Sequence, residues 1–272
     1  MIKLVAIDMD GTLLNSAHKL SQENIDAVRL LESSGIKVVL CTGRPLSGVV
    51  PYFKELSLDE NSFAILNNGC STFHTGSWEL LSYHDIKSDD LVFLEKLTVD
   101  YPGIYMTLTT SDHYYVIGDT VPKIVQDDAD LVFDTVYPIQ LSKFTQNPEP
   151  VFKVMYVGNP SQMDIFQPFA SQQLSQKFNT VRSQPYLFEV LPQGISKATG
   201  LQKLAKDLAI SPENIMGIGD QLNDLEMLKY VGLGVAMGNA PEIVKKASNR
   251  ITDTNDNNGV AKIIASILSD ES

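Results

Sequence analysis

Short apolar runs that end in polar turns recur along this chain. Leu4 to Ile7 leads into Asp8 and a glycine turn, and Ile36 to Leu40 leads towards Thr42. Two later runs have the same form, namely Phe63 to Leu66 before Asn67-Asn68-Gly69 and Ile215 to Ile218 before Gly219-Asp220. Runs of this length between turn residues are typical of strands that are buried on both faces.

A helix-like segment separates the first two runs. Ser21 is suited to an N-cap, and apolar residues recur at helical spacing from Ile25 until Gly35. We expect a second capped helix from Ser196 to Leu208 and a further buried strand from Gly232 to Met237. The strand-helix-strand order predicts an α/β fold with a doubly wound, Rossmann-like parallel sheet.

The pattern of residues changes between about Tyr83 and Val190. Strand-like runs rich in Tyr, Val and Thr alternate there with helical stretches and prolines, at Tyr105–Thr109, Tyr114–Ile117 and Phe152–Val157. We interpret residues 83–190 as an inserted α+β cap domain. Residues 1–82 and 191–272 are expected to form the core.

The chain is acidic, with 33 acidic and 21 basic residues and a net charge of -12. This excess repels nucleic acid and anionic membrane surfaces, and no run rich in Lys or Arg offsets it, so we expect neither as a partner. A phosphate ester is repelled at long range too. Any phosphate site must therefore be made locally, by a metal ion, a lysine and backbone amides.

The apolar stretches are far too short to cross a bilayer. The two cysteines, Cys41 and Cys70, form no CxxC pair, and no secretory leader is evident. We therefore expect a cytoplasmic protein.

Four polar clusters are the candidates for chemistry, and ligands gather at the carboxyl ends of strands in open parallel sheets. The first is Asp8-Met9-Asp10-Gly11-Thr12, in which two carboxylates one residue apart can point to the same side of an extended chain and share a hard cation. A bare DxD is usually a pair of turn aspartates. The full DxDGT string favours chemistry instead.

The other three clusters are weaker when each is taken alone. Thr42-Gly43-Arg44 offers a hydroxyl and backbone amides to phosphate oxygens, although a helix-entry turn is the more ordinary interpretation. Lys197 lies in the first turn of an expected helix, where a cation opposes the helix dipole, although a solvated lysine is common. The segment Gly219 to Asp224 places three polar ligating groups around one turn. Together the four clusters predict a metal or phosphate site.

In this order, DMDGT, TGR, the isolated Lys197 and GDQLND resemble the four motifs of the haloacid dehalogenase-like phosphatase superfamily. The inserted segment is similar to the C2-type cap of its Cof-type branch. TGRPLSGV, FKVMYV, PYLFEVLP and GIGDQLNDLEML are similar to the YidA-like sugar-phosphatase group, and the similarity extends over nearly the whole chain.

The resemblance implies a Mg²⁺-dependent phosphatase that acts on small phosphorylated metabolites, with sugar phosphates as the first choice. Asp8 would attack phosphorus, and Asp10 would protonate the leaving oxygen and later activate water. The Asp8 carboxylate, the Asp10 backbone carbonyl and Asp220 would bind Mg²⁺, whose charge would act with that of Lys197 on the transferring phosphoryl group. The remaining expected roles are phosphate binding by the Met9 amide, Thr42, Gly43, Lys197 and Asn223, orientation of Lys197 or a metal-bound water by Asp224, and an unspecified supporting role for Arg44.

Asp10 also distinguishes phosphate-ester hydrolysis from dehalogenation within this superfamily. A dehalogenase needs no acid two residues after its nucleophile, because a halide leaves unprotonated, so phosphate esters are favoured. Two alternatives stay open: a phosphomutase or phosphotransferase that passes the phosphoryl group to a second hydroxyl, and a noncatalytic sensor, which would be expected to lack Asp8 or Asp10.

Two further expectations concern the cap and the histidines. Closure of the cap would exclude water and select the organic part of the substrate. The four histidines, at positions 18, 74, 84 and 113, have no metal-ligand spacing, and we assign none of them to catalysis. The sequence specifies neither the sugar nor the oligomeric state.

Overall fold

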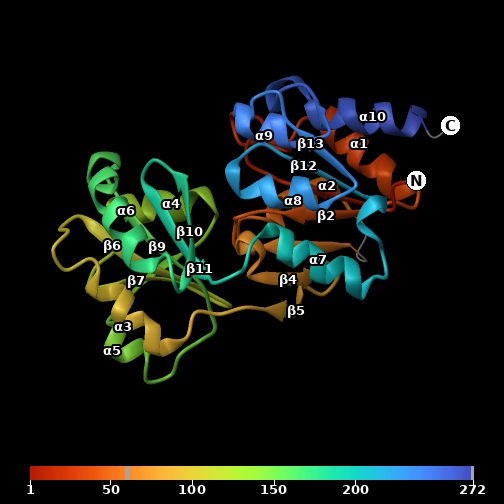
Figure 1. Ribbon diagram of the computed structural model, residues 1–272. Helices are drawn as coiled ribbons and strands as arrows, with labels where there is room; N and C mark the ends of the chain where they lie inside the picture. Colours follow the sequence, from red (N-terminus) through yellow and green to blue (C-terminus); the bar gives the residue numbers. More distant parts are fainter. Residues whose placement is uncertain (59–61, 271–272) are drawn as a thin grey trace. The chain divides into compact units, whose positions relative to one another are not determined.

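The computed structural model describes residues 1–58 and 62–270 of the 272-residue chain. The chain divides into two units (Figure 1), which we name the core unit, Met1–Ser82 with Ser196–Ser272, and the cap unit, Tyr83–Ile195. Each unit has a sheet of its own.

A sheet of eight strands forms the centre of the core unit. The strand order is β14-β13-β12-β1-β2-β3-β4-β5, in which all neighbours from β14 to β3 are parallel and β4 is antiparallel to β3. The strands are β1 (Leu4–Ile7), β2 (Lys37–Cys41), β3 (Phe63–Leu66), β4 (Ser71–His74), β5 (Glu79–Tyr83), β12 (Ile215–Gly219), β13 (Leu233–Ala236) and β14 (Arg250–Ile251).

Helices cover both faces of this sheet because alternate residues of a strand point to opposite sides. Val5 and Ile7 of β1 pack in one apolar cluster with α1, α2 and α10, whereas Leu4 and Ala6 pack in a second cluster with α7, α8 and α9. These helices are α1 (Gln22–Ser33), α2 (Val50–Leu56), α7 (Lys197–Asp207), α8 (Leu225–Tyr230), α9 (Glu242–Ala247) and α10 (Gly259–Asp270). The prediction of a doubly wound α/β core is confirmed.

Capping residues mark the start of two of these helices. The Ser21 side chain accepts a hydrogen bond from the Asn24 amide at the start of α1. At the start of α7, Ser196 and Thr199 form a reciprocal capping box. This box fixes the first turn of α7, where Lys197 lies.

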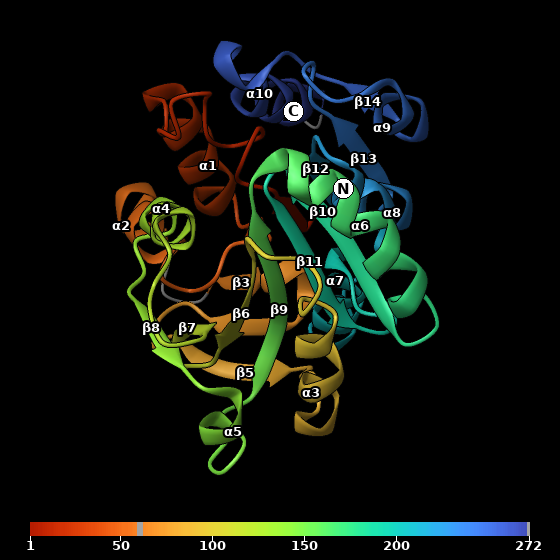
Figure 2. The same ribbon diagram turned by 90° about the vertical axis from the view of Figure 1, so that its left-hand side faces the viewer.

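The cap unit contains a six-stranded sheet in the order β10-β11-β9-β6-β7-β8 (Figure 2). Its neighbours are antiparallel except for β7 and β8, so the sheet is mixed, as expected for an inserted α+β domain. Helices α3 and α6 pack in one apolar cluster, and α4 packs in another. The elements are β6 (Ile104–Thr110), β7 (Tyr114–Ile117), β8 (Val136–Ile139), β9 (Val151–Gly158), β10 (Phe178–Gln184), β11 (Leu187–Pro192), α3 (Ser88–Lys96), α4 (Lys123–Leu131), α5 (Leu141–Phe144) and α6 (Pro160–Leu174).

The chain leaves the cap unit later than the sequence suggested. The expected boundary between residues 190 and 191 falls inside β11, whose Leu191 and Pro192 still pair with β10. The Asn179 side chain also donates a hydrogen bond to the Ile195 carbonyl at 2.9 Å. The last residues of β11 therefore stay with the cap sheet, and the units separate between Ile195 and Ser196.

Candidate active site

Three adjacent parallel strands bring the polar clusters to one edge of the core sheet. Strands β12, β1 and β2 are neighbours, and Asp220, Asp8 and Thr42 follow directly after them. Lys197 reaches the same place from the first turn of α7, since its Nζ lies 2.6 Å from Asp8 Oδ1. Residues up to 212 positions apart in the sequence thus meet at one edge, where ligands bind in such sheets.

Lys197 bridges two buried carboxylates. Its Nζ donates hydrogen bonds to Asp8 Oδ1 at 2.6 Å and to Asp224 Oδ1 at 2.7 Å, and the lysine is only 1% exposed. Burial alone would lower the pKa of Lys197, but the charges of Asp224 and Asp8 outweigh it and raise that pKa. The cation at the start of α7, unfavourable to the helix dipole, is therefore stabilised by these two carboxylates.

Asp8, Asp220 and Asp224 form a compact group of hard oxygen donors. One oxygen from each lies within 4.8 Å of the others, and all three residues are buried. Burial, followed by the charge of Asp224, raises the pKa of Asp8 well above its usual value and raises the pKa of Asp220 to about 6. Crowded carboxylates of this kind suit a divalent cation, which offsets their mutual repulsion.

Two glycines allow these carboxylates to approach the backbone. Gly11 has φ +75°, and a Cβ there would lie 2.4 Å from Asp220 Oδ2. A Cβ at Gly219 would lie 2.5 Å from Asp224 Cγ. Each position requires the absence of a side chain.

Two residues to which the sequence analysis gave no role, Thr12 and Asn239, complete this side of the site. Thr12 Oγ1 donates to Asp220 Oδ1 at 3.0 Å, and Asn239 Nδ2 donates to the Gly11 carbonyl at 2.8 Å and reaches Asp220 Oδ2 at 3.4 Å. Asp224 Oδ2 accepts hydrogen bonds from the backbone amides of Asp220 and Gln221. The DxDGT string could have indicated Thr12, whereas no local pattern indicates Asn239.

Three of the expected phosphate-binding residues, Thr42, Gly43 and Asn223, lie beside Asn68. Asn223 Nδ2 donates to Asn68 Oδ1 at 3.0 Å, and a Cβ at Gly43 would lie 3.1 Å from the same Asn68 amide group. Asn68 has φ 57° and its backbone amide donates to the Thr42 carbonyl at 3.0 Å. Asn68 thus joins Asn223 to the Thr42-Gly43 segment, a contact that was not expected from the sequence.

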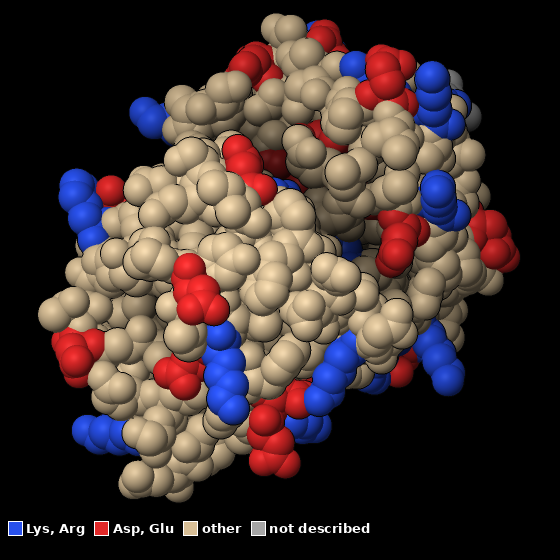
Figure 3. All heavy atoms as spheres, turned by 60° about the vertical axis from the view of Figure 1, so that its left-hand side comes forward, with Lys and Arg blue, Asp and Glu red and all other residues tan. Residues whose placement is uncertain are grey.

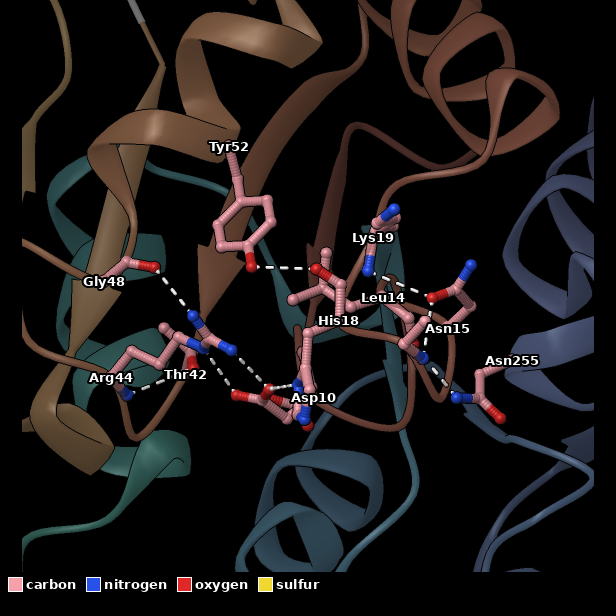
Figure 4. Close-up of polar contacts among 12 residues, drawn as sticks. Asp10, Leu14, Asn15, His18, Lys19, Thr42, Arg44, Gly48, Tyr52 and Asn255 are labelled. Atoms are coloured by element: carbon pink, nitrogen blue, oxygen red, sulfur yellow. Dashed lines mark hydrogen bonds and ion pairs between the residues drawn. The ribbon is translucent and has the colours of Figure 1, made fainter. Parts of the chain in front are cut away.

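The Asp10 carboxylate lies between Arg44 and His18 (Figure 4), an environment different from that of Asp8. Its carboxylate accepts hydrogen bonds from Arg44 Nη2 at 2.6 Å and Nε at 2.7 Å, and His18 Nδ1 lies 3.3 Å from Oδ1. Burial alone would raise the pKa of Asp10, but Arg44, helped by His18, outweighs it and lowers that pKa. Arg44, whose role the sequence left open, is a bidentate partner of Asp10.

Figure 3 shows acidic and basic side chains interspersed on one face of the molecule. In the part of the chain that the structure describes, no helix is both long and apolar enough to cross a membrane.

The sequence matches the haloacid dehalogenase-like hydrolase family over residues 5–264. It is 34% identical over 271 residues to YxeH of Bacillus subtilis (strain 168), covering 98% of this chain and 99% of that protein. It is also 34% identical over 264 residues to the 5-amino-6-(5-phospho-D-ribitylamino)uracil phosphatase YcsE of the same organism, covering 97% of this chain and 94% of YcsE.

A solved structure has the same fold. The crystal structure of a haloacid dehalogenase-like hydrolase from Bacteroides thetaiotaomicron superimposes with a TM-score of 0.88 and 33% identity, covering 98% of this chain and 100% of that one. The family match, these relatives and the shared fold agree. The chain therefore belongs to the haloacid dehalogenase-like hydrolase family and is a phosphatase of that superfamily.

Proposed function

We propose that this chain is a Mg²⁺-dependent phosphatase that hydrolyses small sugar phosphates through an aspartyl-phosphate on Asp8. The observation that carries the proposal is the position of Asp8, whose Oδ1 accepts a hydrogen bond from the buried Lys197 beside the carboxylates of Asp220 and Asp224. Asp10, two residues later, lies in a separate environment where Arg44 binds its carboxylate. The two carboxylates are therefore available for two separate catalytic roles.

Asp8 is the nucleophile in this proposal. Lys197 binds Oδ1, and among residues 1–58 and 62–270 no donor to Oδ2 is recorded. Oδ2 attacks phosphorus, so that a bond from phosphorus to Asp8 forms while the ester bond to the leaving oxygen breaks. Lys197 places a positive charge beside the transferring group. The Met9 amide, Thr42, Gly43 and Asn223 are the proposed ligands of the other phosphate oxygens.

Asp10 is the acid and base in this proposal. It must first take up a proton, which its ion pair with Arg44 opposes, and it then gives that proton to the leaving oxygen as the ester bond breaks. It then takes a proton from a water molecule that attacks phosphorus, which releases inorganic phosphate and regenerates Asp8. This second step distinguishes a hydrolase from a phosphotransferase, in which a substrate hydroxyl takes the place of water.

Mg²⁺ fits the site because the grouped donors are carboxylate oxygens, its preferred ligands. Both oxygens of Asp224 already accept hydrogen bonds, from Lys197 and from two backbone amides. We therefore assign metal binding to the Asp8 and Asp220 carboxylates with the Asp10 carbonyl, and orientation of Lys197 to Asp224. When bound, the ion supplies positive charge that keeps these carboxylates ionised and offsets charge on the phosphoryl group.

A sugar phosphate is the proposed substrate class. The resemblance to the YidA-like sugar-phosphatase group supports it, and the name of YcsE describes a phosphate on a ribityl chain. Sugar phosphates and the substrate named for YcsE both carry a phosphate on a chain of hydroxyl-bearing carbons. We accordingly rank ribose 5-phosphate and the phosphoribitylamino-uracil compound of YcsE first among substrates to test.

Phosphate release from a panel of sugar and nucleotide monophosphates tests the proposal, with Mg²⁺ or EDTA and with wild type or Asp8→Asn. We expect release that needs Mg²⁺ and is abolished by the substitution. An isomeric phosphate in place of inorganic phosphate would identify a phosphomutase, and binding without any turnover would identify a sensor. Release that survives Asp8→Asn undiminished would refute the proposal.

A further inference from the structure

Tyr52 touches both partners of the Asp10 carboxylate (Figure 4). Its hydroxyl donates a hydrogen bond to the His18 carbonyl at 2.9 Å, and the Arg44 guanidinium lies over its ring at 5.2 Å from the centroid. His18 and Arg44 in turn bind Asp10. Tyr52, on helix α2, thus closes a ring of contacts with three residues from other parts of the core unit.

The turn that carries His18 has a defined geometry. Asn15 Oδ1 accepts hydrogen bonds from the amides of Ala17 and Lys19, both at 3.0 Å, and the Asn15 amide donates to the Lys19 carbonyl. His18 itself has φ 53°, a left-handed conformation that histidine adopts more readily than most residues. The hydrogen bonds of Asn15 hold the turn in this conformation.

The opposite side of the turn is anchored to the C-terminal part of the core unit. Asn255 Nδ2 donates to the Leu14 carbonyl at 3.0 Å. The Ser16 amide and hydroxyl donate to the two oxygens of Asp256 at 2.8 and 2.7 Å. With Tyr52 on one side and these residues on the other, the backbone that carries the His18 ring is held beside Asp10.

Asp10 needs such support because its side chain is 37% exposed, compared with 7% for Asp8. An exposed carboxylate can rotate away from the reacting oxygen, and the rate of proton transfer depends on holding it in place. We propose that Tyr52 and His18 are positioning residues for Asp10, which act through the turn 15–19 and the Arg44 guanidinium. This inference rests on the proposed role of Asp10 as acid and base.

The test compares two leaving groups in single-turnover phosphorylation of the Mg²⁺-loaded protein. The leaving oxygen of ribose 5-phosphate needs a proton, whereas the phenolate of p-nitrophenyl phosphate leaves without one. Tyr52→Phe keeps the ring and loses the hydroxyl, and His18→Asn keeps a residue that tolerates positive φ. We expect each to slow phosphorylation by ribose 5-phosphate about tenfold, a part of the full effect of general acid catalysis, and by p-nitrophenyl phosphate less than about twofold.

Two matched controls separate positioning from general damage. Tyr156→Phe removes a buried tyrosine hydroxyl that donates to the Leu94 carbonyl at 2.8 Å in the cap unit. His74→Asn replaces a histidine whose recorded contact is an edge-to-face pair with Phe63. Neither control should change the ratio of the two phosphorylation rates.

Asp10→Asn distinguishes failure of the inference from failure of the proposed function. It should slow the sugar phosphate selectively, and if it does not, the acid role of Asp10 is wrong. If Asp10→Asn is selective but Tyr52→Phe and His18→Asn slow both substrates equally or neither, the positioning role is overturned. The p-nitrophenyl phosphate rate reports the folded active site of each variant, and the exposed His18 tests the role independently if Tyr52→Phe does not fold.

Discussion

Lys197 provides the sharpest test of how this site is stabilised. Lys197→Met removes the cation that lies 2.6 Å from Asp8 and 2.7 Å from Asp224, and it leaves the buried carboxylates to repel one another. Removing one partner of a buried ion pair costs about 3–5 kcal/mol. For a chain of this size, that loss lowers the melting temperature by about 6–20 °C.

The loss should depend on pH in a defined direction. The raised pKa of Lys197 keeps its stabilising charge fully present from pH 5 to pH 8. The folded pKa of Asp220, about 6, is above its usual value, so protonation at pH 5 relieves repulsion that is present at pH 8. The difference in melting temperature between wild type and Lys197→Met should therefore be larger at pH 8 than at pH 5.

Thermal unfolding followed by circular dichroism, in EDTA at both pH values, measures this difference. Lys203→Met is the matched control, because Lys203 lies on the same helix and its ion pair with Asp207 is half exposed. Its loss should stay below about 1 kcal/mol. Equal melting temperatures of wild type and Lys197→Met, or a difference that does not change with pH, would refute the reasoning.

Three further predictions concern the carboxylates and their surroundings. Mg²⁺ should raise the melting temperature more at pH 7.5 than at pH 5, because Asp220, with a pKa of about 6, must lose its proton before it binds a cation. Equal shifts at both pH values, or an unchanged pH dependence in Asp220→Asn, would contradict this. Gly11→Ala should weaken Mg²⁺ binding in titration calorimetry, because the new Cβ would lie 2.4 Å from Asp220 Oδ2. Gly35 has a similar φ, but a Cβ added there would meet no atom within 4 Å. Gly35→Ala should therefore cost about 1–2 kcal/mol of stability and leave Mg²⁺ affinity unchanged. Equal Mg²⁺ affinities of the two variants would count against the close approach of Asp220 to Gly11. Where hydrolysis of the aspartyl-phosphate limits the rate, Asp10 acts as the base, and Arg44→Met should shift the acidic limb of the kcat profile to higher pH because Asp10 loses the cation that lowers its pKa. An unmoved limb would show that Arg44 does not set it.

The sequence was sufficient to place the polar clusters on elements of the core sheet. β1 and β3 have the bounds predicted from their apolar runs, Leu4–Ile7 and Phe63–Leu66. Strand signals are local, and parallel strands bring their carboxyl ends to one edge, so the proximity of Asp8, Thr42 and Asp220 follows from topology alone.

Contacts between distant segments could not be predicted in the same way. Asn68 meets Asn223 across 155 positions, and Tyr52 reaches the His18 carbonyl across 34. Neither pair has a spacing that indicates a contact. His18 was set aside because it lacks metal-ligand spacing, yet its ring lies 3.3 Å from Asp10. The end of the cap unit was also misplaced, because the run Leu187–Pro192 does not reveal where the chain leaves its sheet.

The central claim is that the phosphoryl group passes through Asp8. Rapid acid quenching of Asp10→Asn with Mg²⁺ and p-nitrophenyl phosphate tests it most directly, because this leaving group needs no acid while hydrolysis of the intermediate lacks its base. Peptide mapping should then find a hydroxylamine-sensitive phosphate on Asp8, absent in EDTA and in Asp8→Asn. Turnover with no phosphorylated peptide, or with the phosphate on another residue, would contradict the account.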